Sequence, residues 1–436
     1  MTVDSSTILN SFMDSSISII IYIFLWAVTF FVYQRKKKAF DAGSVIIASY
    51  LTYAVLSYFL YTNYYKDGDV RELQLFPFIY LFLMMLIFLQ PVLRYDGKCK
   101  IQQPRISLIN KISFVIIVAS AIVIPVFLGD LVDAIIVILT TDSGGEELYY
   151  LNSLERDKST SFALFNIFKI IFHVFSDFTI LLFFYSLTLP HIKRIVVFGL
   201  LFTVIVSMLG TIIGGGRTGM TMTMMISVTS FFLFKYQLPS KIRKTVSYLG
   251  IILALFVGSL LVVIGESRFS STSLGSDYQL LNYTGQAPLY FNKYGLDAGG
   301  IRYGDRTCSI FKKILLFDNV PTNFNDCRQK HHKMKLDDSR FTTFVGDFSL
   351  DFGPMLAFII FCLFSFVMVR LTKKRNGTIM FHQLILVFLV MSICITGGMY
   401  LFYYSFKGNY SLIGFFIMYL LFRWDYIHHR NYQLSK

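Results

Sequence analysis

Charged residues are scarce in this chain of 436 amino acids. Asp, Glu, Lys and Arg together make up 15% of the sequence, whereas hydrophobic types make up 55%. Soluble domains contain about 25% charged residues, so the composition argues against a soluble enzyme, a disordered chain and a nucleic-acid-binding domain. No internal repeat stands out, and neither does an inverted repeat of the kind that builds secondary transporters. The composition is that of a membrane protein.

Cysteine is also rare, with five residues in the whole chain. Cys308 and Cys327 fall in the same long connection, where they form either a disulfide in an oxidising compartment or two free thiols. Their spacing to His331 and His332 does not match that of a zinc site. The chain also lacks a P-loop and the set of kinase motifs. The sequence therefore predicts neither a metal nor any other cofactor.

Long apolar runs are what the chain has in abundance. A run of about 20 apolar residues can cross a bilayer as a helix. Eleven such spans are predicted, at 16–34, 43–62, 75–93, 113–132, 163–187, 194–213, 219–236, 245–264, 342–369, 378–397 and 405–422. The expected fold class is therefore an all-α polytopic membrane protein.

Negative charge is the scarcer sign, because 40 Lys and Arg residues oppose 26 Asp and Glu, for a net charge of +14. More than half of the basic residues fall in alternate short connections and in the C-terminal tail, beginning with the run 35–38. Basic connections face the cytoplasm. We therefore expect a multi-pass membrane protein whose N-terminus lies outside the cytoplasm and whose C-terminus lies inside it. The positive charge is then a topology signal and no sign of a nucleic-acid partner.

One predicted periplasmic connection is much longer than the others. It divides the chain into residues 1–264, with eight spans and short loops, the connection 265–341, and residues 342–436, with the last three spans and the tail. A connection of this length within a compact chain commonly carries structure of its own. We expect 265–341 to form a folded cap or a partly helical lid before the ninth span.

The turn after the sixth span combines glycines with one arginine. Gly215, Gly216, Arg217 and Thr218 lie between two spans, at the predicted periplasmic face. Main-chain N–H groups at a helix start and a guanidinium group both bind phosphate oxygens. The turn therefore predicts a phosphate or pyrophosphate site. The alternative is a tight helical hairpin with a solvated arginine.

Further charged residues border the long connection. Glu266 and Arg268 end the eighth span, and Arg340 precedes the ninth. Asp347 and Asp351 are four residues apart, so they share one face of the ninth helix. Two carboxylates so close raise the pKa of one of them, as a general acid or base requires. The alternative is a polar helix start.

The fifth span carries three ionisable residues. Lys169, His173 and Asp177 are each four apart and therefore lie on one helix face. Ionisable groups within a membrane are costly, and they usually mark function. This face is either the polar wall of a cavity that opens outward or a self-neutralising ladder that fixes the helix to its neighbours.

Two segments, Gly214–Gly219 and Thr342–Gly353, resemble motifs of the bacterial O-antigen and capsule repeat-unit polymerases, the Wzy type. Those membrane glycosyltransferases have a similar number of spans and a large outer loop in their second half. The resemblance implies a GT-C-like fold, metal-independent chemistry, and undecaprenyl-diphosphate-linked oligosaccharides as donor and acceptor. It also implies membrane lipid, a flippase and a chain-length regulator as partners, and an active site that faces the periplasm.

The resemblance also implies roles for the residues singled out above. The donor pyrophosphate would be bound by Arg217, Arg268, Arg340, Gly215, Gly216 and Thr218. The proton of the acceptor hydroxyl would pass to one of the candidate bases, Asp351, Asp347, Glu266 or His173. Lys169 and Asp177 would line the cavity.

Two other functions stay open at this point. An O-antigen ligase uses the same fold and donor, and it usually shows a histidine in its large outer loop, as His331 and His332 are here. A non-enzymatic polysaccharide flippase is the second alternative, although its two similar halves and its lack of a large loop fit this chain less well.

Overall fold

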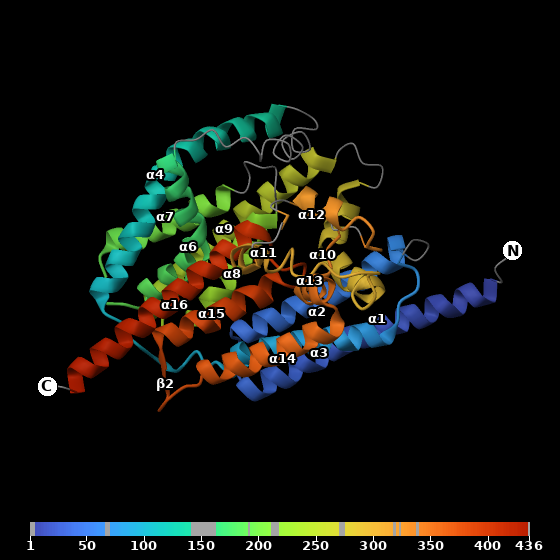
Figure 1. Cartoon of the computed structure of the whole chain (residues 1–436), viewed down its shortest axis with the longest axis horizontal. Helices are drawn as coiled ribbons and strands as arrows, with labels where there is room; N and C mark the ends of the chain where they lie inside the picture. The colour runs from blue at the N-terminus through green and yellow to red at the C-terminus, as the bar shows by residue number, and fades with distance from the viewer. Residues whose placement is uncertain are drawn as a thin grey trace. The chain divides into compact units, whose positions relative to one another are not determined.

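The computed structural model describes residues 5–65, 70–140, 163–190, 192–210, 218–269, 275–316, 320–321, 324–336 and 340–434 (Figure 1). Among them, seven helical stretches are long and apolar enough to cross a membrane: Asp14–Lys37, Ala42–Tyr65, Leu75–Arg94, Ile106–Pro125, Asn166–Ser186, Ser240–Leu260 and Pro354–Leu371. Three shorter apolar helices are Arg194–Leu209, Thr218–Phe234 and Phe381–Thr396. The chain is an all-α polytopic membrane protein, as its composition predicts.

Contacts divide the chain into two compact units, each built from segments that are distant in the sequence. Unit 1 contains residues 1–95, 277–371 and 389–409, and unit 2 contains residues 96–276, 372–388 and 410–436. The three-part division at 264/265 and 341/342 concerns spans and loops along the chain, and it stays a prediction.

Unit 1 begins with three long helical segments and returns to them late in the chain. Its elements are α1 (Ser5–Lys37), α2 (Ala42–Leu60), η1 (Tyr61–Tyr65), α3 (Leu75–Arg94), most of α10 (Gly275–Tyr294), α11 (Ser309–Leu316), α12 (Phe324–Lys330), α13 (Thr343–Phe352) and α14 (Pro354–Leu371). Figure 1 shows α14 alongside α3. Aromatic side chains fill this contact, where the ring of Phe88 stacks on that of Phe364 with centroids 4.6 Å apart.

The long connection before the ninth predicted span is largely helical. It contains α10, α11 and α12, so the described part has helical structure of its own, while its role as a periplasmic cap or lid stays a prediction. We call residues 295–336 the cap, of which the structure describes 295–316, 320–321 and 324–336.

The ninth predicted span, 342–369, is two helices instead of one. α13 ends at Phe352 and α14 begins at Pro354. Gly353 between them has a φ of 78°, in the left-handed region that favours glycine. Proline lacks a main-chain N–H and disfavours helical backbone in the residue before it. The hydropathy of the run is continuous, so hydropathy alone does not reveal this break.

Unit 2 holds the middle of the chain. Its elements are β1 (Lys100–Gln102), α4 (Ile106–Thr140), α6 (Ala163–Ser186), α7 (Arg194–Leu209), α8 (Thr218–Phe234), α9 (Ser240–Phe269), β2 (Thr378–Met380), the first half of α15 (Phe381–Thr396) and most of α16 (Ser405–Leu434). β1 and β2 pair in parallel, with Lys100 opposite Thr378 and Gln102 opposite Met380. Three-residue strands are too short to produce an alternating pattern, so the sequence did not predict them.

Gly414 lies where α16 approaches α6 closely. A Cβ at this position would collide with the main-chain carbonyl oxygen of Val174. Gly414→Ala is therefore expected to force the helices apart and to destabilise the protein by about 1–3 kcal/mol, as measured by thermal unfolding in detergent. Gly250→Ala is the matched control, because a Cβ there meets no atom within 4 Å. Equal stability of the two variants would contradict this packing.

Candidate functional site

Four charged side chains meet where the cap contacts α13. Arg302 Nε lies 2.7 Å from Asp351 Oδ1, and Arg302 Nη2 lies 3.7 Å from Asp347 Oδ1. Arg306 Nε lies 3.4 Å from the same Asp347 oxygen. Asp347 and Asp351 thus share one face of α13, as their spacing predicts. We call Arg302, Arg306, Asp347 and Asp351 the Arg–Asp cluster.

Main-chain groups hold the second oxygen of each carboxylate in this cluster. The N–H of Thr307 donates to Asp351 Oδ2 over 2.7 Å. The N–H of Leu401 donates to Asp347 Oδ2, also over 2.7 Å. Each carboxylate therefore has an arginine on one oxygen and a main-chain donor on the other. These contacts fix the orientation of both aspartates.

The four side chains of the Arg–Asp cluster are buried, so their ion pairs matter for the stability of the fold. The side chains of Arg302 and Asp351 are 0% exposed, and Asp347 is 2% exposed. Arg306 is also buried, with its guanidinium carbon 4.7 Å from the ring centroid of Tyr404. Charges out of contact with water are tolerated only where opposite charge and hydrogen bonds offset the loss of hydration. The two arginines supply that offset, and they fasten the cap to α13.

Asn409, at the start of α16, holds the other side of the same loop. Its amide nitrogen donates to the carbonyl oxygens of Thr307 and Tyr403, each over 2.9 Å. Its amide oxygen accepts from Ser309 Oγ and from the N–H of Ile310. One buried side chain therefore joins the loop after Arg306 to the segment that leads into α16.

Strained backbone surrounds the Arg–Asp cluster. Tyr303, Thr343 and Ser405 have φ values of 54°, 69° and 58°, and they are three of the five described non-glycine residues with positive φ. The N–H of Ser405 donates to the carbonyl oxygen of Arg306 over 2.8 Å. Such conformations cost about 1–3 kcal/mol each and cluster at functional sites. The strain therefore marks this region as a candidate functional site.

Asp305 carries a second group of ionic contacts within the cap. Its carboxylate oxygens lie 2.6 Å from Lys312 Nζ, 2.7 Å from Lys330 Nζ and 3.0 Å from His331 Nε2. Burial by itself raises the pKa of Asp305, but the hydrogen bonds from Lys312, Lys330 and His331 outweigh it and lower the pKa below its usual value. This carboxylate joins α11 to the segment at the end of α12.

The lowered pKa of Asp305 predicts a pH dependence. Its contribution to stability is complete above the unfolded-state pKa of about 3.9 and is lost as the pH falls through the lower folded-state pKa. Asp305→Asn is therefore expected to destabilise the protein by about 1–3 kcal/mol at pH 7. The difference from the parent should shrink below about pH 4 in thermal unfolding scans across pH.

Asp297→Asn is the control for this experiment. Asp297 pairs with Lys335, but its side chain is 75% exposed, so solvent and salt screen the pair. Its replacement should have a much smaller effect at every pH. A difference between Asp305→Asn and the parent that does not change between pH 7 and pH 3 would contradict the assignment.

Most of the residues predicted to bind pyrophosphate are not described by the structure. Arg340 is exposed, with its guanidinium carbon 5.3 Å from the ring centroid of Tyr290. Thr218 is the first residue of α8. Gly215, Gly216 and Arg217 lie outside the described residues, and so do the side chains of Glu266 and Arg268 at the end of α9. The pyrophosphate site therefore stays a prediction.

The ionisable face of the fifth predicted span lies on α6. Lys169 is exposed, His173 is half-buried with its ring centroid 5.6 Å from that of Phe172, and Asp177 is buried. Exposure thus decreases along this face from Lys169 to Asp177. The cavity wall and the self-neutralising ladder stay alternative predictions for it.

Arg302 and Arg306 were not among the predicted site residues. The available signal was the run Arg302–Arg306 itself, in which an acid and a glycine stand between two arginines. Gly304 in that run has a φ of 79°, which lets the chain turn so that both arginines reach α13. Two acids on one helix face need nearby cations, and this run supplies them.

No disulfide joins the two cysteines of the long connection. Cys308 is half-buried and Cys327 is buried. Of the two predicted alternatives, the one without a disulfide is therefore correct. Ion pairs and hydrogen bonds, and no disulfide between these cysteines, connect the cap to α13.

Comparisons with protein-family models, with curated proteins and with solved structures give no significant match to this chain. The resemblance of its two short motifs to the repeat-unit polymerases stays a prediction.

Proposed function

We propose that this protein is a GT-C-like membrane glycosyltransferase that polymerises undecaprenyl-diphosphate-linked oligosaccharide repeat units. It would cross the bacterial inner membrane eleven times, with its active site at the periplasmic face. The growing glycan would leave one lipid diphosphate and join the repeat unit on a second lipid diphosphate. The product would be a surface polysaccharide, either the O-antigen of lipopolysaccharide or a capsule.

The observation that most supports this proposal is the helical cap fastened to α13. A polymerase must hold two large lipid-linked chains in register above the membrane, because correct positioning supplies much of its rate. The cap offers exposed cations that attract diphosphate groups, namely Arg328 and Lys333, whereas Lys330 and Lys335 pair with Asp305 and Asp297. Arg340, just before α13, adds one more exposed cation. A simple flippase has no need of such a cap.

The chemistry needs positive charge at the leaving group. The bond between the sugar carbon and the diphosphate oxygen breaks, and the diphosphate departs with the electron pair. Guanidinium groups stabilise that developing negative charge through paired hydrogen bonds. Arg217, Arg268 and Arg340 are the residues proposed for this role.

The acceptor hydroxyl must lose a proton as its oxygen bonds to the sugar carbon. Asp347 and Asp351 are both buried, and each is held by an arginine and a main-chain N–H. These contacts favour a positioning role for the pair, in which they hold the cap over α13. The base is then expected among the other two candidates, Glu266 and His173.

Purified protein supplied with lipid-linked repeat units alone tests the proposal. A polymerase produces a ladder of products, each one repeat longer than the last, and releases undecaprenyl diphosphate. A ligase produces no ladder because it needs a second, lipid A-core acceptor. A flippase moves the substrate across vesicles without forming a new glycosidic bond. Absence of both the ladder and the released diphosphate would overturn the proposal.

A further inference from the structure

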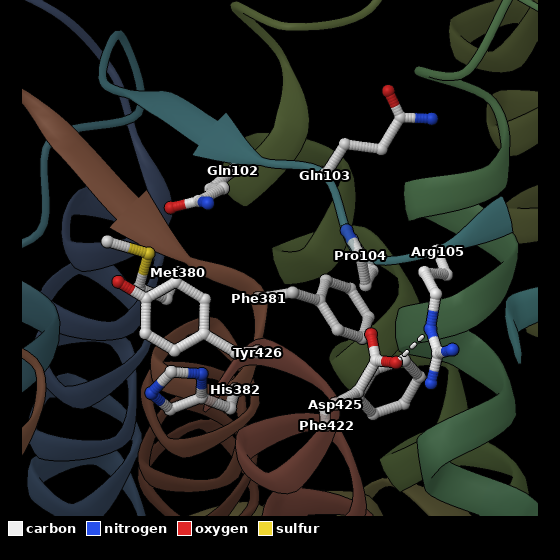
Figure 2. Close-up of a pocket in the computed structure, with 10 residues that line it drawn as sticks. All are labelled: Gln102, Gln103, Pro104, Arg105, Met380, Phe381, His382, Phe422, Asp425 and Tyr426. Atoms are coloured by element: carbon white, nitrogen blue, oxygen red, sulfur yellow. Dashed lines mark hydrogen bonds and ion pairs between the residues drawn. The ribbon is translucent and has the colours of Figure 1, made fainter. Parts of the chain in front are cut away.

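A cavity of about 250 Å³ with both polar and apolar lining lies within unit 2, beside the strand pair (Figure 2). Three segments line it: the end of β1 with the turn into α4, the end of β2 with the start of α15, and the second half of α16. Basic residues of the neighbouring connections predict that this end of unit 2 faces the cytoplasm. The proposed polymerase reaction makes no use of this cavity.

The strand pair explains why these segments meet. The parallel register places Gln102 opposite Met380, so the end of β1 lies beside the start of α15, where His382 follows Phe381. Arg105 then forms an ion pair with Asp425, whose side chain is 2% exposed. This pair, drawn as a dashed line in Figure 2, fixes α16 to the start of α4.

Two half-buried polar groups of the lining form no hydrogen bond within the described part of the chain: the ring nitrogens of His382 and the hydroxyl of Tyr426. The side-chain amide of Gln102 forms none there either, and Gln102 is exposed at the edge of the cavity. Figure 2 shows the rings of His382 and Tyr426 next to one another, and their centroids lie 5.5 Å apart. Donors and acceptors that converge on a cavity fix the orientation of a ligand.

The charges of the side chains that line the cavity favour a neutral ligand over an ionic one. Arg105 and Asp425 neutralise one another, while Gln102 and Tyr426 carry no charge at neutral pH. An ionic ligand would find no uncompensated opposite charge in this lining. A hydroxyl group, by contrast, both donates and accepts, so it can bond a guanidinium, a carboxylate, an amide or a phenol.

The size and the aromatic walls narrow the choice further. Ligand pockets for drug-sized molecules span about 300–1,000 Å³, so this cavity holds one ring. The half-buried ring of Tyr426, next to the buried rings of Phe381 and Phe422, offers a flat apolar surface that suits the C–H face of a saturated ring. We infer that the cavity beside β1 and β2 is a binding site for a neutral, hydroxylated, single-ring ligand of the monosaccharide class.

Direct binding to the purified full-length protein tests this inference. The protein is held in lipid nanodiscs free of sugar-based detergent, and ligands are followed by saturation-transfer NMR and calorimetry. The panel contains glucose, galactose, mannose and N-acetylglucosamine, with glucose 1-phosphate and adenosine as charged and planar comparisons. Saturable binding of at least one neutral sugar is expected. Binding of no neutral sugar, or of the phosphate or adenosine alone, overturns the inference.

Variants assign the binding to this cavity. Gln102→Ala and Tyr426→Phe should each weaken the binding of the neutral sugar several-fold, and together by tenfold or more. Tyr248→Phe is the matched control, because Tyr248 is exposed on α9 and does not line the cavity. Unchanged sugar affinity in the double variant, with unfolding temperature preserved, overturns the inference. The readout is binding alone, so its outcome is independent of whether the protein polymerises glycans.

Discussion

Replacing Arg302 with leucine is expected to lower the free energy of unfolding by about 3–5 kcal/mol. The guanidinium of Arg302 is completely buried and faces both Asp347 and Asp351. Its removal leaves two buried carboxylates with Arg306 as their remaining guanidinium partner in the cluster. A buried charge that has lost its partner keeps the cost of dehydration without the attraction that offset it. Denaturant unfolding in micelles, followed by circular dichroism, measures the loss.

Two further variants make this experiment decisive. Lys333→Leu changes an exposed cation of the same cap and should alter stability by at most about 0.5 kcal/mol. The double variant Arg302→Leu, Asp351→Leu should recover part of the loss, because an apolar pair replaces the broken ion pair. If Arg302→Leu is no less stable than Lys333→Leu, the cluster does not fasten the cap.

Arg217→Ala is expected to abolish polymer and to leave single-repeat lipid intermediates, if the proposed function is correct. Removing one donor from a site of developing charge lowers the rate by about 10²–10³, and that slows every round of extension. Arg217→Lys should fail as well, because an ammonium group cannot form the paired hydrogen bonds of a guanidinium. Polymer length on gels and the chromatography of lipid-linked intermediates measure both effects.

The matched control for Arg217 is Arg194→Ala. Arg194 is an exposed arginine at the start of α7, in a connection predicted to face the cytoplasm. Its replacement should leave the polymer unchanged at equal expression. Long polymer in the Arg217→Ala strain at normal expression would remove Arg217 from the active site.

Span-forming helices are the part of the fold that the sequence predicts best. The run 75–93 corresponds to α3, Leu75–Arg94, because a bilayer demands about 20 consecutive apolar residues with internal main-chain hydrogen bonds. No comparable pattern in the sequence predicted that Lys100–Gln102 pairs with Thr378–Met380. Its strands are short, and each is defined by a partner from a distant part of the chain.

The sequence predicted two of the four residues of the Arg–Asp cluster, the aspartates, and missed the two arginines. A spacing of four residues places Asp347 and Asp351 on one helix face in any α-helix, so local geometry sufficed. Their partners, Arg302 and Arg306, belong to a loop whose path depends on Gly304 and on Asn409 of another segment. Contacts of that kind arise from tertiary structure, and no periodicity in the sequence encodes them.

The discontinuity of both units has a consequence for biogenesis. Translation delivers β1 to the membrane long before β2, and the strand pair cannot form until Thr378–Met380 has left the ribosome. Unit 1 and unit 2 each also need a segment from residues 389–436. Neither unit can therefore be completed before its segment of 389–436 has been synthesised, so the two units cannot fold one after the other in the order of the chain. A protein truncated at residue 371 would leave both units unfinished, and such nascent chains should be substrates for membrane quality-control proteases.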